Sequence, residues 1–205
     1  MKSRQVAFTA LMSALGLLLS AISLNIAPIF TAVGQGGAAL DLSHIATFIA
    51  AIFGGSIFGG VVGFLSGVYA GYYFGYVMGS LGLLSLVGVP SGKALTGLTA
   101  GLLYRTLRIN SRPKPSLLTV LVVLISYVPE CLFTIAYFRF LVPFFYGRVM
   151  EFMIPIVISK AWVEIFVMSL LMGALNGNSG FRDFIIRFLG TQKLPALPKK
   201  HEKQL

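Results

Sequence analysis

Long apolar stretches, separated by short polar or glycine-rich segments, run through almost the whole chain of 205 residues. The stretch 6–26 contains no charged residue, and neither does the stretch 45–91. A helix needs about 20 apolar residues to cross the hydrocarbon core of a bilayer, so the first stretch predicts one span and the second predicts two. A glycine-rich break at 54–56 divides the second stretch into spans over 43–54 and 57–77.

Three further apolar stretches, at 91–107, 116–140 and 153–176, each predict one more span. Pro90 is expected to close the glycine-rich connection that precedes the fourth span. The predicted fold is therefore an all-α membrane protein with six transmembrane helices. This number of spans leaves too little chain for a separate soluble domain.

The last part of the chain predicts a different kind of helix. Apolar residues recur at helical spacing over 181–189, with charged residues on the opposite face, which is typical of a helix lying in the membrane interface. We assign 1–190 to the six-helix transmembrane domain, with this interfacial helix near its end. Residues 191–205 are expected to form a basic cytoplasmic tail.

Composition and charge support this membrane assignment. Charged residues make up 11% of the chain, whereas a soluble domain usually has about 25%. The net charge of +10 does not indicate a nucleic-acid partner, because the positive residues cluster at the ends of the predicted spans. Cytoplasmic loops are enriched in Lys and Arg, which predicts a cytoplasmic N-terminus and C-terminus. The inner segments then hold Lys2, Arg4, Arg105, Arg108, Arg112, Lys114, Arg182, Arg187, Lys193, Lys199, Lys200 and Lys203.

Signatures of catalysis, metal binding or a cofactor are absent from the sequence. The two histidines, His44 and His201, lie in no zinc-protease motif, and no nucleophile elbow or cysteine pair occurs. The segment 88–94 resembles a phosphate-binding loop, but its spacing is one residue short. Ala94 also stands where a Ser or Thr must hold magnesium. We expect no enzymatic activity, no metal and no bound cofactor.

Charged residues within the predicted spans are the strongest candidates for a functional site, because burying charge in a membrane is costly. The predicted depths bring four of them together in the outer half of the membrane, with three aromatic residues as flat apolar walls. The candidate substrate-binding residues are Lys93, Glu130, Lys160, Glu164, Trp162, Tyr127 and Tyr137. They form either a ligand pocket or ion pairs that hold helices together. Asp41 and Ser43 are predicted to cap the second helix.

Small residues predict two close helix contacts, since they let helix backbones approach in a membrane. Glycines recur every four residues from Gly55 to Gly79. Each such step turns the row by about 40° on an α-helix, so we expect several neighbours to share it. On the first helix, Ala7, Ala10 and Ala14 form a shorter small-residue stripe.

Several short runs resemble the substrate-binding S components of energy-coupling factor (ECF) transporters. They are LDLSHI at 40–45, AIFGG at 51–55 and GGVVG at 59–63, which resemble the second and third helices of that family. In the family an AxxxA motif near the start of the first helix contacts the transmembrane coupling subunit, and Ala10 and Ala14 match it. The chain departs from the family at Gly55, where such proteins often have proline.

The resemblance implies a substrate-binding subunit in a prokaryotic cell membrane that takes up a small, water-soluble, vitamin-like micronutrient. It implies that the loop 25–40 closes over a substrate held by the fourth to sixth helices. The implied partners are a transmembrane coupling (T) protein and a pair of ATPases, besides membrane lipid. Two other classes stay open. One is a self-sufficient ion-coupled carrier, and the other is an intramembrane enzyme that uses Glu130 or Glu164 as an acid or base.

Overall fold

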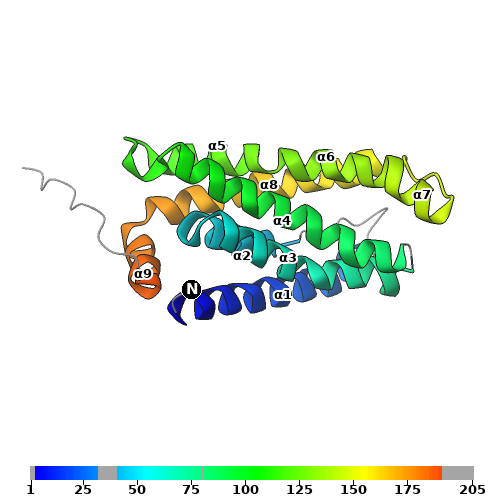
Figure 1. The fold of residues 1–205 in the computed structure, drawn as a ribbon, viewed down its shortest axis with the longest axis horizontal. Coiled ribbons are helices and arrows are strands. Elements are labelled where there is room, and N and C mark those ends of the chain that lie inside the picture. Colours follow the sequence, from blue (N-terminus) through cyan, green and yellow to red (C-terminus); the bar gives the residue numbers. More distant parts are fainter. Residues whose placement is uncertain (1–2, 32–40, 80, 191–205) are drawn as a thin grey trace, which may run out of the picture.

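The computed structural model of the protein describes residues 3–31, 41–79 and 81–190, which form a helical bundle with no strand among them (Figure 1). The α-helices are α1 (Ser3–Thr31), α2 (His44–Ile49), α3 (Ser56–Tyr72), α4 (Gly82–Thr106), α5 (Pro115–Ser126), α6 (Val128–Ala136), α7 (Val142–Tyr146), α8 (Met153–Gly177) and α9 (Ser179–Leu189). π-Helical turns over Ala50–Gly54, Tyr73–Val77 and Tyr137–Leu141 extend α2, α3 and α6.

Five helical segments are long and apolar enough to cross a membrane. They are Ser3–Ile26, Ser56–Val77, Gly82–Ser111, Pro115–Tyr146 and Met153–Gly177. The predicted span at 43–54 is instead the shorter apolar helix His44–Gly54. At 1.5 Å per residue it reaches roughly 16 Å, about half the hydrocarbon thickness of a bilayer. The prediction of an all-α membrane protein is thus confirmed, and five of its six spans are present as long apolar helices.

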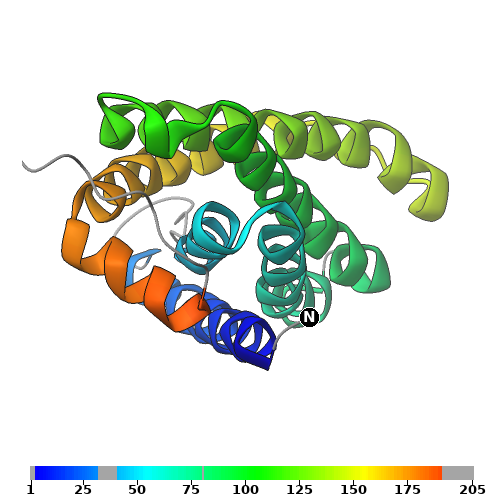
Figure 2. The same cartoon turned by 60° about the vertical axis from the view of Figure 1, so that its left-hand side comes forward.

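The short helix α2 lies inside the bundle rather than on its surface. It contacts α1, α3, α4 and α8, and Figure 2 shows it, in cyan, enclosed by the longer helices. Its side chains from Ala46 to Ile49 are buried. The predicted break after it is confirmed: Gly55 adopts a φ of 110°, which favours glycine, and the chain then turns back into α3.

The predicted start of the fourth span is wrong. Helix α4 begins at Gly82 rather than near residue 91, and Pro90 lies inside it. A proline is tolerated within a membrane helix where neighbouring groups support the interrupted backbone. Here α3 packs closely along this part of α4: a Cβ atom placed on Gly67 would lie 2.7 Å from the Cα atom of Pro90. Tertiary packing therefore keeps this glycine-rich stretch helical.

The expectation that several neighbours share the glycine row of α3 is confirmed only in part: a Cβ atom on Gly59 would lie 2.5 Å from the Cβ atom of Ala51, but α4 follows the whole row. A Cβ atom on any of five glycines would come within 2.4–2.8 Å of an α4 atom. These glycines are Gly59, Gly63, Gly67, Gly71 and Gly75. A row of residues four apart is inclined by about 26° to the helix axis, so one helix that crosses at a matching angle follows all of it. The glycine row is thus chiefly the contact surface for α4.

Gly97 on α4 allows a sharp test of this contact. A Cβ atom there would lie 2.1 Å from the carbonyl oxygen of Gly59. Gly97→Ala should therefore force the two backbones apart and destabilise the protein by about 1–3 kcal/mol, the usual cost of overpacking. Thermal unfolding of the purified protein in detergent measures this. Gly180→Ala is the control, because its nearest neighbour would be the Asn178 side chain at 3.3 Å. Equal stability of both variants would refute the close contact.

One end of the bundle gathers the positive charge. The N-terminus of α1, the α4–α5 connection and α9 lie at the same end, on the left in Figure 1. We call this the basic end, and it carries Arg4, Arg105, Arg108, Arg112, Lys114, Arg182 and Arg187. The predicted helix near 181–189 is confirmed as α9, whose Phe188 ring lies 6.3 Å from the ring of Phe8. The predicted tail at 191–205 and most of the predicted loop at 25–40 fall outside the described residues.

Candidate functional site

A cavity of about 410 Å³ lies between α4, α6, α8 and the start of α2. All four charged residues singled out from the sequence, Lys93, Glu130, Lys160 and Glu164, line it. Asp41 and His44, from the segment that leads into α2, line it as well. Its volume falls within the range of roughly 300–1,000 Å³ that is typical of small-molecule sites. The structure therefore brings the predicted charges together around one space.

The ammonium of Lys93 is held by the segment that precedes α2. Lys93 donates to a carboxylate oxygen of Asp41 and to the hydroxyl of Ser43. Both charged side chains are buried, 4% and 9% exposed. Burial by itself raises the pKa of the Asp41 carboxyl, but the Lys93 ammonium beside it lowers that pKa well below its ordinary value. Asp41 is therefore an anion, and the pair fixes the start of α2 against α4.

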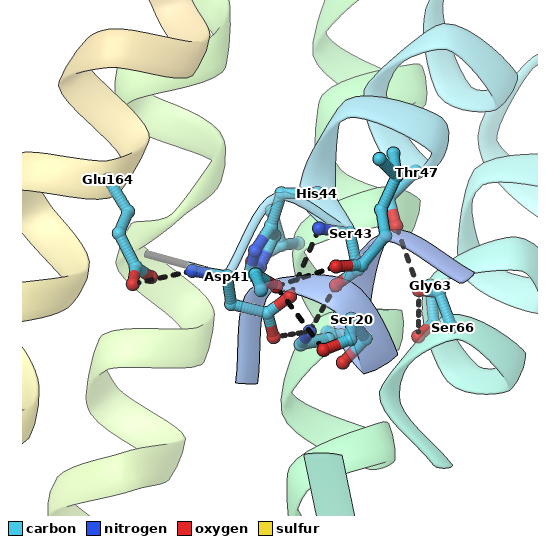
Figure 3. A network of polar contacts seen from close by, with 12 residues as sticks. Ser20, Asp41, Ser43, His44, Thr47, Gly63, Ser66 and Glu164 are labelled. Carbon is cyan, nitrogen blue, oxygen red and sulfur yellow. Dashed lines mark hydrogen bonds and ion pairs between the residues drawn. The ribbon is translucent and has the colours of Figure 1, made fainter. Parts of the chain in front are cut away.

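Glu164 on α8 joins this pair through the backbone. Its Oε1 atom accepts a hydrogen bond of 2.8 Å from the amide of Asp41, a contact that Figure 3 shows. The same atom lies 3.4 Å from the Nζ atom of Lys160, one turn earlier on the helix. The Lys160 side chain is 22% exposed, against 5% for Glu164. Lys160 therefore presents the more accessible charge of this pair.

Glu130 on α6 has a different set of partners. Its Oε2 atom accepts a hydrogen bond from the hydroxyl of Thr96 and lies 3.4 Å from Nε2 of His44. Among the described residues, no lysine or arginine pairs with it. The Nδ1 atom of His44 is buried and has no hydrogen-bond partner in that part of the chain. Glu130 is thus a partly buried carboxylate without a permanent cationic partner.

The predicted aromatic residues occupy unequal positions. Tyr127 and Tyr137 line the cavity. Trp162 does not, because it packs behind Tyr127 with ring centroids 5.3 Å apart and is 36% exposed on the surface. Phe74 adds an aromatic wall that sequence reasoning missed, and the Nζ atom of Lys160 lies 6.0 Å from its ring centroid.

Asp41 and His44 were not predicted as site residues. The prediction that both Asp41 and Ser43 cap α2 is wrong for Ser43, which makes no side-chain cap hydrogen bond and instead accepts from Lys93. Asp41 does accept a hydrogen bond of 3.0 Å from the backbone amide of Ser43, just before the helix. One signal in the sequence pointed to Asp41: it is the only charged residue between Arg4 and Lys93. A buried lysine needs a carboxylate partner, and Asp41 is the carboxylate that lies within this long apolar stretch before Lys93.

Three carboxylates and two ammonium groups therefore line the cavity. The carboxylates therefore outnumber the ammonium groups by one, which favours a ligand that brings a positive or hydrogen-donating group. The side chains of the described residues include no group of three or more His, Cys, Asp or Glu arranged to hold a metal ion. The arrangement is suited to reversible binding of a polar organic molecule.

Comparisons of the chain with protein-family models, with curated proteins and with solved structures found no match. The class of protein therefore rests on the fold and the cavity alone. They define a membrane-embedded, all-helical protein with a charged internal cavity.

Proposed function

We propose that the protein is a membrane subunit that binds a small, water-soluble micronutrient and delivers it for uptake energised by partner ATPases. The cavity of about 410 Å³ carries this proposal, because its charged groups are enclosed by helices that are otherwise apolar. Ionisable residues inside a membrane bundle are costly, and they commonly mark substrate or ion pathways. A vitamin-sized molecule matches the volume, and the few charged groups set among mostly apolar lining residues suit a water-soluble ligand with an apolar body.

The contacts in the cavity refine the ligand chemistry. The Lys93 ammonium already donates hydrogen bonds to Asp41 and Ser43. It therefore supports the structure of the site and does not contact the ligand. Glu130 and Lys160 are the charged groups with spare hydrogen-bonding capacity. The proposed ligand places a cationic or amine donor against Glu130 and a carbonyl or similar acceptor against Lys160. Tyr127 and Phe74 would cover its flat faces.

Coupling to a partner is proposed for the outer face of α1. Ala7, Ala10 and Ala14 are exposed there, beside exposed Leu11 and Leu18. An exposed row of alanines leaves a shallow groove, which a second helix can fill more closely than lipid can. The proposed occupant is the transmembrane coupling (T) protein that joins the binding subunit to a pair of ATPases.

The proposed topology places both ends of the chain in the cytoplasm of a prokaryotic cell. In this arrangement α2 supplies the second of six passes, descending from the cavity to the basic end, and Gly55 turns the chain back into α3. The gathering of arginines and lysines at the basic end supports this orientation through the positive-inside rule.

Glu130→Gln tests the binding site directly. The substitution keeps the size of the side chain and removes its charge, so we expect at least a tenfold loss of ligand retained through purification. Mass spectrometry of extracts from equal amounts of folded protein measures the ligand. Glu151→Gln is the control, because Glu151 is 50% exposed in the α7–α8 connection. Equal retention by both variants would remove Glu130 from the site.

A further inference from the structure

A second cavity, of about 350 Å³, opens at the basic end of the bundle. It is lined by Arg105, Arg108 and Arg182, which come from α4, the α4–α5 connection and α9. Ile52, Phe53 and Ile186 supply an apolar floor, and no carboxylate is among the lining residues. Three like charges converge on one hollow, which is unfavourable unless an anion neutralises them.

Two of the three arginines have unused hydrogen-bond donors. The Nε atom of Arg182 is buried and has no hydrogen-bond partner in the described part of the chain. Its nearest carboxylate there, that of the half-exposed Asp183, lies 4.0 Å away. Arg108 makes no ion pair or side-chain hydrogen bond within residues 3–31, 41–79 and 81–190. A buried N–H without a partner is costly, which points to an acceptor that the described residues do not supply.

The walls of this cavity are fixed by a polar network. The hydroxyl of Tyr104 donates to the side-chain oxygen of Asn110 at 2.6 Å and lies 3.0 Å from that of Asn176. Asn176 in turn donates to Thr119 at 2.8 Å. Arg105 is held in place by donating to the carbonyl of Gly54 at 2.9 Å. The α4–α5 connection is thereby tied to α8, and Arg105 is held in position before an anion binds.

We propose that this cavity binds a phosphate group, either of an anionic phospholipid or of free phosphate. Guanidinium groups match phosphate oxygens in geometry, and several of them around one phosphate give strong charge-assisted hydrogen bonds. The position fits a headgroup, since α8 ends and the amphipathic α9 begins beside it. Basic pockets at the ends of membrane helices recognise such headgroups. This site is separate from the substrate cavity and does not depend on the proposed function.

The test uses the full-length protein in detergent and native mass spectrometry. The probes are dioleoyl phosphatidylglycerol and dioleoyl phosphatidylcholine, and inorganic phosphate is titrated as a competitor. We expect phosphatidylglycerol to bind preferentially, and Arg182→Gln and Arg108→Gln each to weaken it about tenfold. Arg148→Gln, at the opposite end of the bundle, is the matched loss of one positive charge and should leave binding unchanged.

The binding results distinguish a lipid headgroup, free phosphate and no anion site. Preference for phosphatidylglycerol that both cavity variants reduce supports a lipid headgroup. Stabilisation of the wild type by inorganic phosphate, over chloride at equal ionic strength, with no lipid preference, supports free phosphate. No effect of either probe, or equal loss in the Arg148 control, overturns the site. If a cavity variant fails to fold, competition between inorganic phosphate and phosphatidylglycerol on the wild type still decides.

Discussion

Lys93→Met is expected to destabilise the protein by about 3–5 kcal/mol, the usual cost of removing one partner of a buried ion pair. The substitution leaves the Asp41 carboxylate buried without its ammonium partner. It also removes the donor that Ser43 accepts from, and so frees the start of α2. Thermal unfolding of the purified protein in detergent measures the loss, together with the yield of folded protein.

The double variant Asp41→Asn/Lys93→Met distinguishes a loss of stability caused by an unpaired buried charge from one caused by lost packing of the Lys93 side chain. It removes both charges, so it should recover most of the stability that the single variant loses. Arg148→Met controls for the loss of an exposed positive charge and should have little effect. A double variant as unstable as Lys93→Met alone would show that the pair does not act as a unit.

If the proposed function holds, Ala10→Trp and Ala14→Trp are each expected to abolish ATP-dependent uptake by the proposed complex with the coupling protein and ATPases. An indole ring on the exposed stripe of α1 would hold a partner helix too far away to pack. Binding of substrate by the isolated subunit should survive, because neither residue lines the substrate cavity. Uptake in vesicles and ligand binding in detergent are measured on the same variants.

Ala174→Trp is the matched control for the alanine stripe. Ala174 is exposed near the basic end of α8, so its substitution adds the same ring on a different helix. Unchanged uptake in that variant, with loss in the α1 variants, assigns coupling to α1. Loss of binding and uptake together would instead indicate a folding defect, and intact uptake would remove the proposed contact.

The apolar pattern predicted the long helices well because length and hydropathy alone decide whether a segment suits a membrane. Residues 153–176, for example, correspond closely to α8, Met153–Gly177. The pattern failed where packing overrides local signals. Pro90 reads as a helix boundary, but α3 lies close enough to keep α4 helical through it. Likewise, the stretch 45–91 has no charged residue to mark where a helix ends, so its apolar pattern does not reveal that α2 is short.

Part of the candidate site was also predictable. The cost of burying charge singled out Lys93, Glu130, Lys160 and Glu164 before any geometry was known, and all four line one cavity. Their pairing was not predictable, because it depends on where residues distant in sequence meet. Asp41 pairs with a residue 52 positions later in the chain, a contact that no local periodicity encodes.

Native mass spectrometry of the tagged protein, released gently from the membranes of its own cells, tests the central claim most directly. We predict one small polar organic molecule bound per chain. We also predict a larger assembly that adds a second membrane protein and two ATPase subunits. A chain that carries a ligand but never associates with ATPases would favour a self-sufficient carrier. A chain that carries neither a ligand nor ATPases would contradict the proposed function.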